Sequence, residues 1–289
     1  MNQRTRTTRP ARAVGVTFAV LLASCSSDST DSSRDVNQPA SADASASTTT
    51  TGSDNDLPEG AEALVGRFAH FDAVSYEDDT MKTVIISTGY ADFDIRDGQI
   101  WNQMTFCHAD TATDQSIEVG LSDAATRAIK PVATPVELSR VDGKLHVSRP
   151  ATPTGIGITF DDPASDILPT DPTDPRIIDA DGDGKPGVTS TIKLGEDFEA
   201  EIYLARREIF AYEVTQESPD RFVGSITDDS EQLILGATDP LFETPTEWVQ
   251  LEDPARNPVI WQRVDAGTDC DAIAQQRAEL FPPNPAADW

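Results

Sequence analysis

Apolar and polar residues alternate with a period of two in several segments between residues 84 and 263. This period is typical of strands that bury one face and expose the other. Asp97-Gly98 and Asp142-Gly143 each lie between two such segments. Because both residue types tolerate the positive φ of tight turns, each pair predicts a hairpin. The apolar members of the alternation are Phe93, Ile95, Ile100, Met104, Phe106, Val136, Leu138, Leu145, Val147, Phe198, Ala200, Ile202, Leu204, Phe222, Ile226, Leu233, Leu235, Val259 and Trp261.

Hairpins that follow one another directly predict an antiparallel meander. A sheet of this many strands has to close into a barrel or fold into a sandwich to protect its edges. We therefore predict an all-β domain whose antiparallel meander closes as a barrel, with a β-sandwich as the alternative. A short C-terminal helix is also predicted, because Thr268 and Asp271 have capping-box spacing and Pro282-Pro283 end the helical pattern that follows.

The start of the chain has a different pattern. Four arginines and no acid occupy residues 1–12, residues 13–24 are almost wholly apolar or small, and Cys25 follows. A positive region, a short apolar region and a small-residue cleavage site predict a secretory signal. The alternatives are an ordinary signal peptide with an incidental cysteine and a transmembrane anchor. For the anchor the apolar stretch is short, because a spanning helix needs about 20 apolar residues.

The junction Leu22-Ala23-Ser24-Cys25 resembles the lipobox of bacterial lipoproteins, whose signal peptide is cut before the cysteine. The resemblance implies that Cys25 carries a lipid. It also implies that the protein is exported and attached, through this N-terminal lipid, to the cell membrane or outer membrane of a bacterium.

Composition divides the rest of the chain into two parts. Residues 26–56 are mostly Ser, Thr, Asp and Ala, and they contain too few large apolar residues to form a core. The predicted organisation is therefore a signal peptide (1–24), a lipidated cysteine with a disordered tether (25–56) and a single β-rich domain (57–289). This domain contains an acidic, proline-rich loop (161–187).

Charge and cysteine content limit the partners. The chain has 50 acidic and 22 basic residues, a net charge of −28. Such a charge repels nucleic acid and attracts divalent cations, so we expect no nucleic-acid partner. In an exported protein, Cys107 and Cys270 predict a disulfide, with two buried thiols as the alternative.

The strongest candidate site is the segment Asp179-Ala180-Asp181-Gly182-Asp183-Gly184. Carboxylates at positions 1, 3 and 5 of a loop converge on one point, and a glycine at position 6 permits the sharp turn. The segment resembles the calcium loops of EF-hand-like, dockerin and integrin-type repeat proteins. This resemblance implies a Ca²⁺ ion that orders residues 161–187, held by Asp179, Asp181, Asp183 and the carbonyl group of Lys185.

Two departures from those calcium loops remove negative charge from the site. Gly187 stands where the integrin-type repeats have an aspartate, and Ser190 stands where the EF-hand has a bidentate glutamate. We therefore expect weak binding. The alternative is an Asp-rich turn that holds no ion.

No catalytic motif stands out, and His70, His108 and His146 do not have the spacing of a transition-metal site. We predict no catalytic residues and favour a non-enzymatic structural or binding role at the cell envelope, with the protein or small-ligand partner undefined. One alternative is a carrier of a small apolar ligand, because a barrel with a C-terminal helix resembles lipocalins in outline. The other is an envelope hydrolase that uses paired carboxylates.

Overall fold

The computed structural model describes residues 57, 59–244 and 248–289. The predicted signal peptide, Cys25 and the predicted tether lie outside these residues. The strands are β1 (Gly66–Glu77), β2 (Lys82–Arg96), β3 (Gln99–Thr113), β4 (Ile117–Leu121), β5 (Thr134–Pro135), β6 (Glu137–Val141), β7 (Lys144–Ile156), β8 (Val188–Leu194), β9 (Phe198–Ser218), β10 (Arg221–Asp228), β11 (Glu231–Ala237), β12 (Val249–Gln250) and β13 (Pro258–Arg263). The α-helices are α1 (Asp123–Arg127) and α2 (Cys270–Leu280), and short 3₁₀ turns are η1 (Ala61–Leu64), η2 (Pro240–Phe242) and η3 (Pro254–Arg256).

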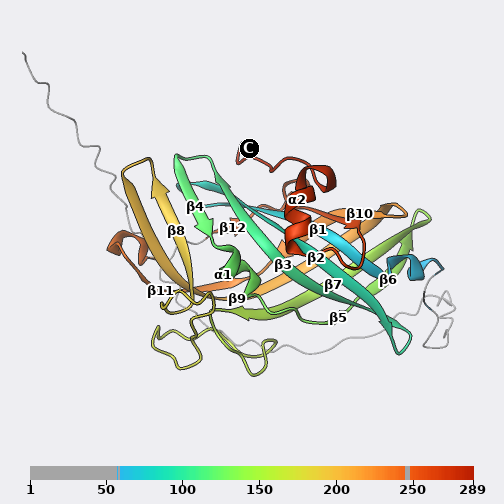
Figure 1. The fold of residues 1–289 in the computed structure, drawn as a ribbon, viewed down its shortest axis with the longest axis horizontal. Coiled ribbons are helices and arrows are strands. Elements are labelled where there is room, and N and C mark those ends of the chain that lie inside the picture. Colours follow the sequence, from blue (N-terminus) through green and yellow to red (C-terminus); the bar gives the residue numbers. More distant parts are fainter. Residues whose placement is uncertain (1–56, 58, 245–247) are drawn as a thin grey trace, which may run out of the picture. The chain divides into compact units, whose positions relative to one another are not determined.

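These strands form one antiparallel sheet that curls into a half-barrel (Figure 1). Its main path runs in the order β4-β8-β9-β10-β13-β1-β2-β3-β5. The predicted antiparallel all-β class is therefore confirmed. Neighbours in the sheet are not always neighbours in the sequence, however, since β13 lies between β10 and β1. The prediction of a simple meander is therefore wrong. Periodicity in the sequence identifies strands, but it does not identify which strands pair.

Both predicted Asp-Gly hairpins are present. Asp97 and Gly98 have φ values of 50° and 76°, and Asp142 and Gly143 have values of 51° and 79°. Positive φ at both central residues is the requirement of the type I′ turn, whose twist matches that of the flanking strands. The two turns join β2 to β3 and β6 to β7.

Strand β9 is the longest and belongs to two parts of the sheet. Its N-terminal half pairs with β8 and β11, and its C-terminal half pairs with β7 and β10. The sheet path ends at β5, and within the described residues no backbone ladder joins β5 to β7. The two strands are linked there by the hydroxyl groups of Thr134 and Thr152, whose oxygen atoms lie 3.0 Å apart.

The sheet is buried on both sides at β1. Its inner face meets a core that includes Phe68, Trp261 and Phe222, and its outer face packs against α2 and the segment after it. Phe281 lies on Phe71 with their ring centroids 5.6 Å apart. The predicted C-terminal helix is present, although its N-cap is Asp269, whose carboxylate accepts from the Ala272 amide at 2.9 Å.

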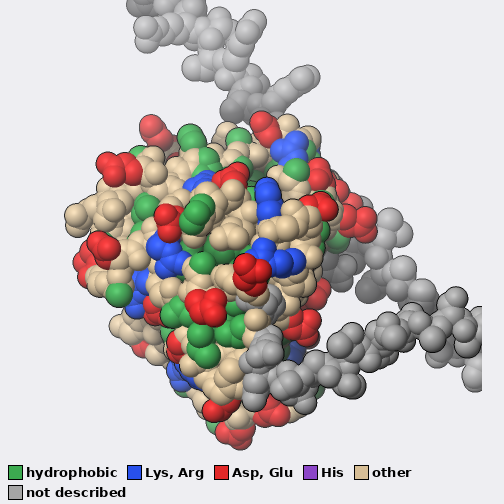
Figure 2. Space-filling view, turned by 90° about the vertical axis from the view of Figure 1, so that its right-hand side faces the viewer, with side chains coloured by type: hydrophobic (Ala, Val, Ile, Leu, Met, Phe, Trp, Pro, Cys, Tyr) green, Lys and Arg blue, Asp and Glu red, His purple; other side chains and the backbone are tan. Residues whose placement is uncertain are grey.

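Surface charges are mixed on the face that Figure 2 shows. Lys and Arg side chains lie among Asp and Glu side chains, and apolar side chains form small separate groups. Within the described part of the chain, no helix has the length and apolar content needed to cross a membrane.

Candidate metal centre

The segment between β7 and β8 is held as a compact loop at the lower left of Figure 1. Its two ends are joined by backbone hydrogen bonds, from the Ile178 amide to the Gly157 carbonyl at 3.0 Å and from the Gly187 amide to the Ile178 carbonyl at 2.9 Å. The Ala180 amide also donates to the Gly187 carbonyl at 2.9 Å. The candidate calcium segment is therefore closed at its base next to β8.

The structure brings the three predicted aspartates together. One carboxylate oxygen from each of Asp179, Asp181 and Asp183 lies within 4.8 Å of the other two. Asp179 folds the loop around itself, because its carboxylate accepts from the amides of Gly182 at 2.8 Å and Gly184 at 2.9 Å. Both glycines have positive φ, 78° and 86°. This is the backbone that the spacing of the aspartates predicts.

Asp181 has an oxygen without a partner. Its Oδ2 accepts from the Thr189 amide at 2.9 Å, whereas its Oδ1 is buried and has no hydrogen-bond donor among the described residues. A buried carboxylate oxygen without a donor is unfavourable, and nearby carboxylates add repulsion. A hard divalent cation would satisfy this oxygen and neutralise the cluster, so the donor set fits a divalent metal ion.

Asp183 is held by β8. Its Oδ2 accepts from the Thr189 hydroxyl at 2.5 Å, and its Oδ1 accepts from the Lys185 amide at 2.9 Å. The hydrogen bond from Thr189, followed by that from Lys185, lowers the pKa of Asp183 below its ordinary value. The carboxylate is therefore charged and oriented without an ion.

Two of the three carboxylates face an open cleft of about 310 Å³. Asp181 and Asp183 form one wall, the end of β4 and the start of α1 form another, and Asp179 does not line it. The cleft thus leads from solvent to these two residues, while Oδ1 of Asp181 is itself buried. The remaining lining residues are Gly120, Leu121, Ser122, Thr189 and Thr191.

The predicted role of Lys185 is to coordinate the ion through its backbone carbonyl group, whereas its side chain forms ion pairs at the site. Its ammonium group pairs with Glu201 and lies 3.9 Å from Asp183 Oδ2. The hydrogen bond to Glu201 raises the pKa of Lys185, so this side chain stays positively charged beside the cluster. It therefore competes with a metal ion. Coordination by its carbonyl oxygen stays a prediction.

The residue at loop position 9 departs from the integrin-type pattern for a steric reason. Gly187 has a φ of 81°, and a Cβ atom there would lie 2.1 Å from the Leu204 carbonyl oxygen. No aspartate fits at this position. The close packing of the loop against β9 explains the lost ligand.

Ser190, at position 12, turns away from the aspartates. Its hydroxyl donates to the Gly120 carbonyl at 3.1 Å, and the neighbouring Thr189 reaches Asp183 instead. Thr189 is not among the site residues predicted from the sequence. The alternation of β8 could have identified it, because Val188, Ser190 and Ile192 are the buried positions and Thr189 lies on the opposite face.

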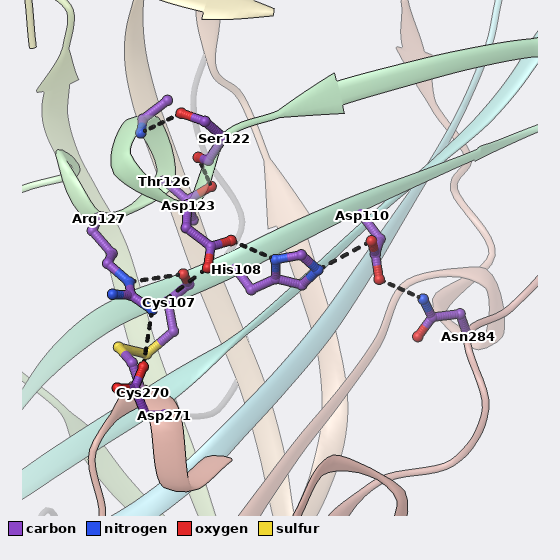
Figure 3. Close-up of polar contacts among 11 residues, drawn as sticks. Cys107, His108, Asp110, Ser122, Asp123, Thr126, Arg127, Cys270, Asp271 and Asn284 are labelled. Atoms are coloured by element: carbon purple, nitrogen blue, oxygen red, sulfur yellow. Dashed lines mark hydrogen bonds and ion pairs between the residues drawn. A yellow bond between two sulfur atoms is a disulfide. The ribbon is translucent and has the colours of Figure 1, made fainter. Parts of the chain in front are cut away.

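The predicted disulfide joins Cys107 of β3 to Cys270 of α2 (Figure 3). Polar contacts surround it. Arg127 of α1 donates from Nε to the Cys107 carbonyl at 3.3 Å, and its Nη2 lies 3.5 Å from carboxylate oxygens of both Asp123 and Asp271. The disulfide and Arg127 together attach α1 and α2 to the same strand.

His108 lies beside this junction on the surface. Its Nδ1 is 2.6 Å from Asp123 Oδ1 and its Nε2 is 3.1 Å from Asp110 Oδ1, as Figure 3 shows. Partial burial lowers the pKa of His108, but the hydrogen bond to Asp123 and the charge of Asp110 outweigh burial and raise it. Asp110 also accepts from the Asn284 amide at 2.9 Å, so the contact extends to the C-terminal segment.

The three histidines lie on separate strands. His146 of β7 is 2.9 Å from Glu213 Oε2 on the polar side of its strand, as expected. His70 of β1 is fully buried, with its Nε2 2.6 Å from Asp72 Oδ2, and the Tyr212 hydroxyl donates to the same oxygen at 3.2 Å. The sequence pattern did not predict this buried polar group.

Among the described residues, the aspartate cluster is the group of His, Cys, Asp and Glu side chains whose spacing suits a metal ion. No family model matches the chain, and neither a curated protein nor a solved structure is detectably similar to it.

Proposed function

We propose that the protein is an exported, lipid-anchored envelope protein whose β-domain (57–289) has a non-enzymatic structural or binding role. A calcium ion on Asp179, Asp181 and Asp183 stabilises its loop. The observation that carries the calcium site is the buried, unpartnered Oδ1 of Asp181 within a cluster of three carboxylates. The lipid anchor rests on the sequence around Cys25.

We also propose that the curled sheet closes into a barrel whose interior is filled by side chains. The contact between Thr134 and Thr152 supports closure at β5 and β7, and the packed aromatic core supports a filled interior. A carrier needs a cavity of about 300–1,000 Å³. The pocket beside Tyr212 has a volume of about 20 Å³, and the larger cleft of about 310 Å³ is lined by Asp181 and Asp183, which suits a cation better than an apolar ligand.

The calcium ion would bind weakly. Three carboxylates are fewer charged ligands than an EF-hand supplies, and the Lys185 ammonium group lies 3.9 Å from Asp183. The dissociation constant should resemble that of extracellular modules, about 10⁻⁴ to 10⁻³ M. Such a site acts as a structural clamp under constant millimolar calcium.

Calcium is expected to stabilise the wild-type protein, by about 2.7 kcal/mol at 100 times the dissociation constant. Thermal melts in calcium and in chelator measure this difference. Asp181→Ala should abolish it, because the variant loses the oxygen that lacks a partner. Asp79→Ala, which changes an exposed aspartate in the turn between β1 and β2, should retain it. Equal melting temperatures for the wild type across a millimolar calcium titration would refute the site.

Cys25→Ser is expected to move the protein from the membrane fraction to the soluble fraction, because the lipid can no longer be attached. Even one acyl chain gives only marginal membrane binding, so a protein without any lipid should leave the membrane fraction completely. Fractionation of cells that express the variant measures it, with Ser27→Ala as a matched control that stays membrane-bound. A wild-type protein that itself keeps residues 1–24, with a Cys25→Ser variant equally membrane-bound and uncleaved, would contradict the anchor.

A further inference from the structure

Arg149 of β7 is a buried cation without an anionic partner. Its side chain lies inside the curled sheet, where the residue is 5% exposed. Its Nη1 donates to the Phe210 carbonyl at 3.1 Å, and its Nε is buried without an acceptor. Within the described residues no carboxylate forms an ion pair with it. Arg206, by contrast, has its Nε 3.0 Å from Glu208 Oε1.

The aromatic ring beside Arg149 does not supply a negative charge. The guanidinium carbon lies 5.5 Å from the centroid of the Tyr212 ring. Burial, followed by the charge of Asp72, raises the pKa of Tyr212 well above its ordinary value, so the phenol is neutral. Arginine remains protonated in proteins. A buried charge of this kind requires a counter-charge, since desolvation without pairing is strongly unfavourable.

Arg149 lines a small pocket. Its volume is about 20 Å³, and it lies between β3, β7, β9 and the segment before β5. Lys130, an exposed residue, also lines it, so a second basic residue borders the pocket in a strongly acidic protein. The apolar side chains that complete its walls are Met104, Phe106, Ile129, Val132 and Phe210.

The hydroxyl groups in this pocket are already directed elsewhere. Thr152 donates to the Pro150 carbonyl at 2.9 Å, and Thr154 donates to the Lys130 carbonyl at 3.3 Å. The N–H groups of Arg149 are therefore the donors that remain for a ligand. The register of β7 against β9 shifts between Arg149 and Thr152, so an irregularity in the strand separates these side chains.

We propose that this pocket binds a single monatomic anion, chloride, with Arg149 as its main ligand and Lys130 at its mouth. A volume of about 20 Å³ favours a monatomic anion over the larger phosphate or organic acids. Water would fit but would leave the charge of Arg149 uncompensated. Apolar walls strengthen the attraction between anion and guanidinium group because they lower the local dielectric constant.

Chloride is expected to raise the melting temperature of the full chain relative to gluconate at equal ionic strength. At ten times the dissociation constant the shift should be roughly 3–5 °C. Bromide should act like chloride, and fluoride should act less, because the smaller ion costs more to dehydrate. Acetate with the same effect as chloride would overturn the monatomic class, and equal melting temperatures in chloride and gluconate would overturn the site.

Arg149→Met should abolish the chloride shift, because it replaces the buried guanidinium group with an apolar chain. Arg96→Met, the same change at an exposed arginine of β2, should leave the shift intact.

A second test uses the wild type alone, so its result does not depend on whether Arg149→Met folds. The ³⁵Cl resonance should broaden on adding the protein and sharpen again when bromide displaces chloride. A line width that bromide does not change would overturn the proposal.

Discussion

Asp72→Ala is expected to lower the free energy of unfolding by about 3–5 kcal/mol. Asp72 is 2% exposed, and its Oδ2 lies 2.6 Å from His70 Nε2 and 3.2 Å from the Tyr212 hydroxyl. Alanine leaves both of these groups buried without their partner. The loss is measured by urea denaturation of the variant and the wild type.

Asp92→Ala provides the matched control for this change. Asp92 lies on β2, and its carboxylate accepts from Arg67 through two hydrogen bonds of 2.7 Å. Its side chain is 45% exposed, so the loss should stay below about 1 kcal/mol. A similar loss for both variants would contradict the importance that we assign to the buried carboxylate.

Removing the disulfide is expected to destabilise the protein by about 5 kcal/mol in the chain-entropy model. The bond closes a loop with a sequence separation of 163 residues. The double variant Cys107→Ala, Cys270→Ala avoids free thiols and should detach α2 from the sheet. Its denaturation midpoint should match that of the reduced wild type. A midpoint equal to that of the oxidised wild type would mean that packing by Ile273 and Phe281 holds α2 unaided.

Features that depend on a few adjacent residues could be predicted from the sequence. The turns at Asp97-Gly98 and Asp142-Gly143 and the approximate bounds of α2 depend on local backbone preferences. The disulfide could be predicted because the chain offers few cysteines. Strand order could not, because the pairing of β13 with β10 and β1 depends on contacts between distant segments.

Strand β1 was missed for a physical reason. It is buried on both faces, with apolar residues such as Phe71 on the outer face and polar residues such as His70 and Asp72 among those on the inner face. His70 and Asp72 are thus buried, although alternation would assign these polar positions to the solvent-exposed face. The burial of these polar residues could be recognised only once α2 was known to cover the apolar outer face.

The candidate metal centre was likewise predictable only in part. The spacing of Asp179, Asp181 and Asp183 identified the loop because that spacing itself sets the geometry. The cleft depends on Gly120 to Ser122, which come from a distant part of the chain. The position of Thr189 depends on the register of β8.

The pairing of β1 has a consequence for the order of folding during synthesis. Phe68 pairs with Arg263, so one edge of β1 lacks this partner until β13 has left the ribosome, almost 200 residues later. Non-local pairing of this kind slows folding, because distant segments have to meet before the contacts form. Until then, the β1 edge is open to pairing with other chains. The time between synthesis of β1 and synthesis of β13 is therefore the period in which mispairing is most favoured.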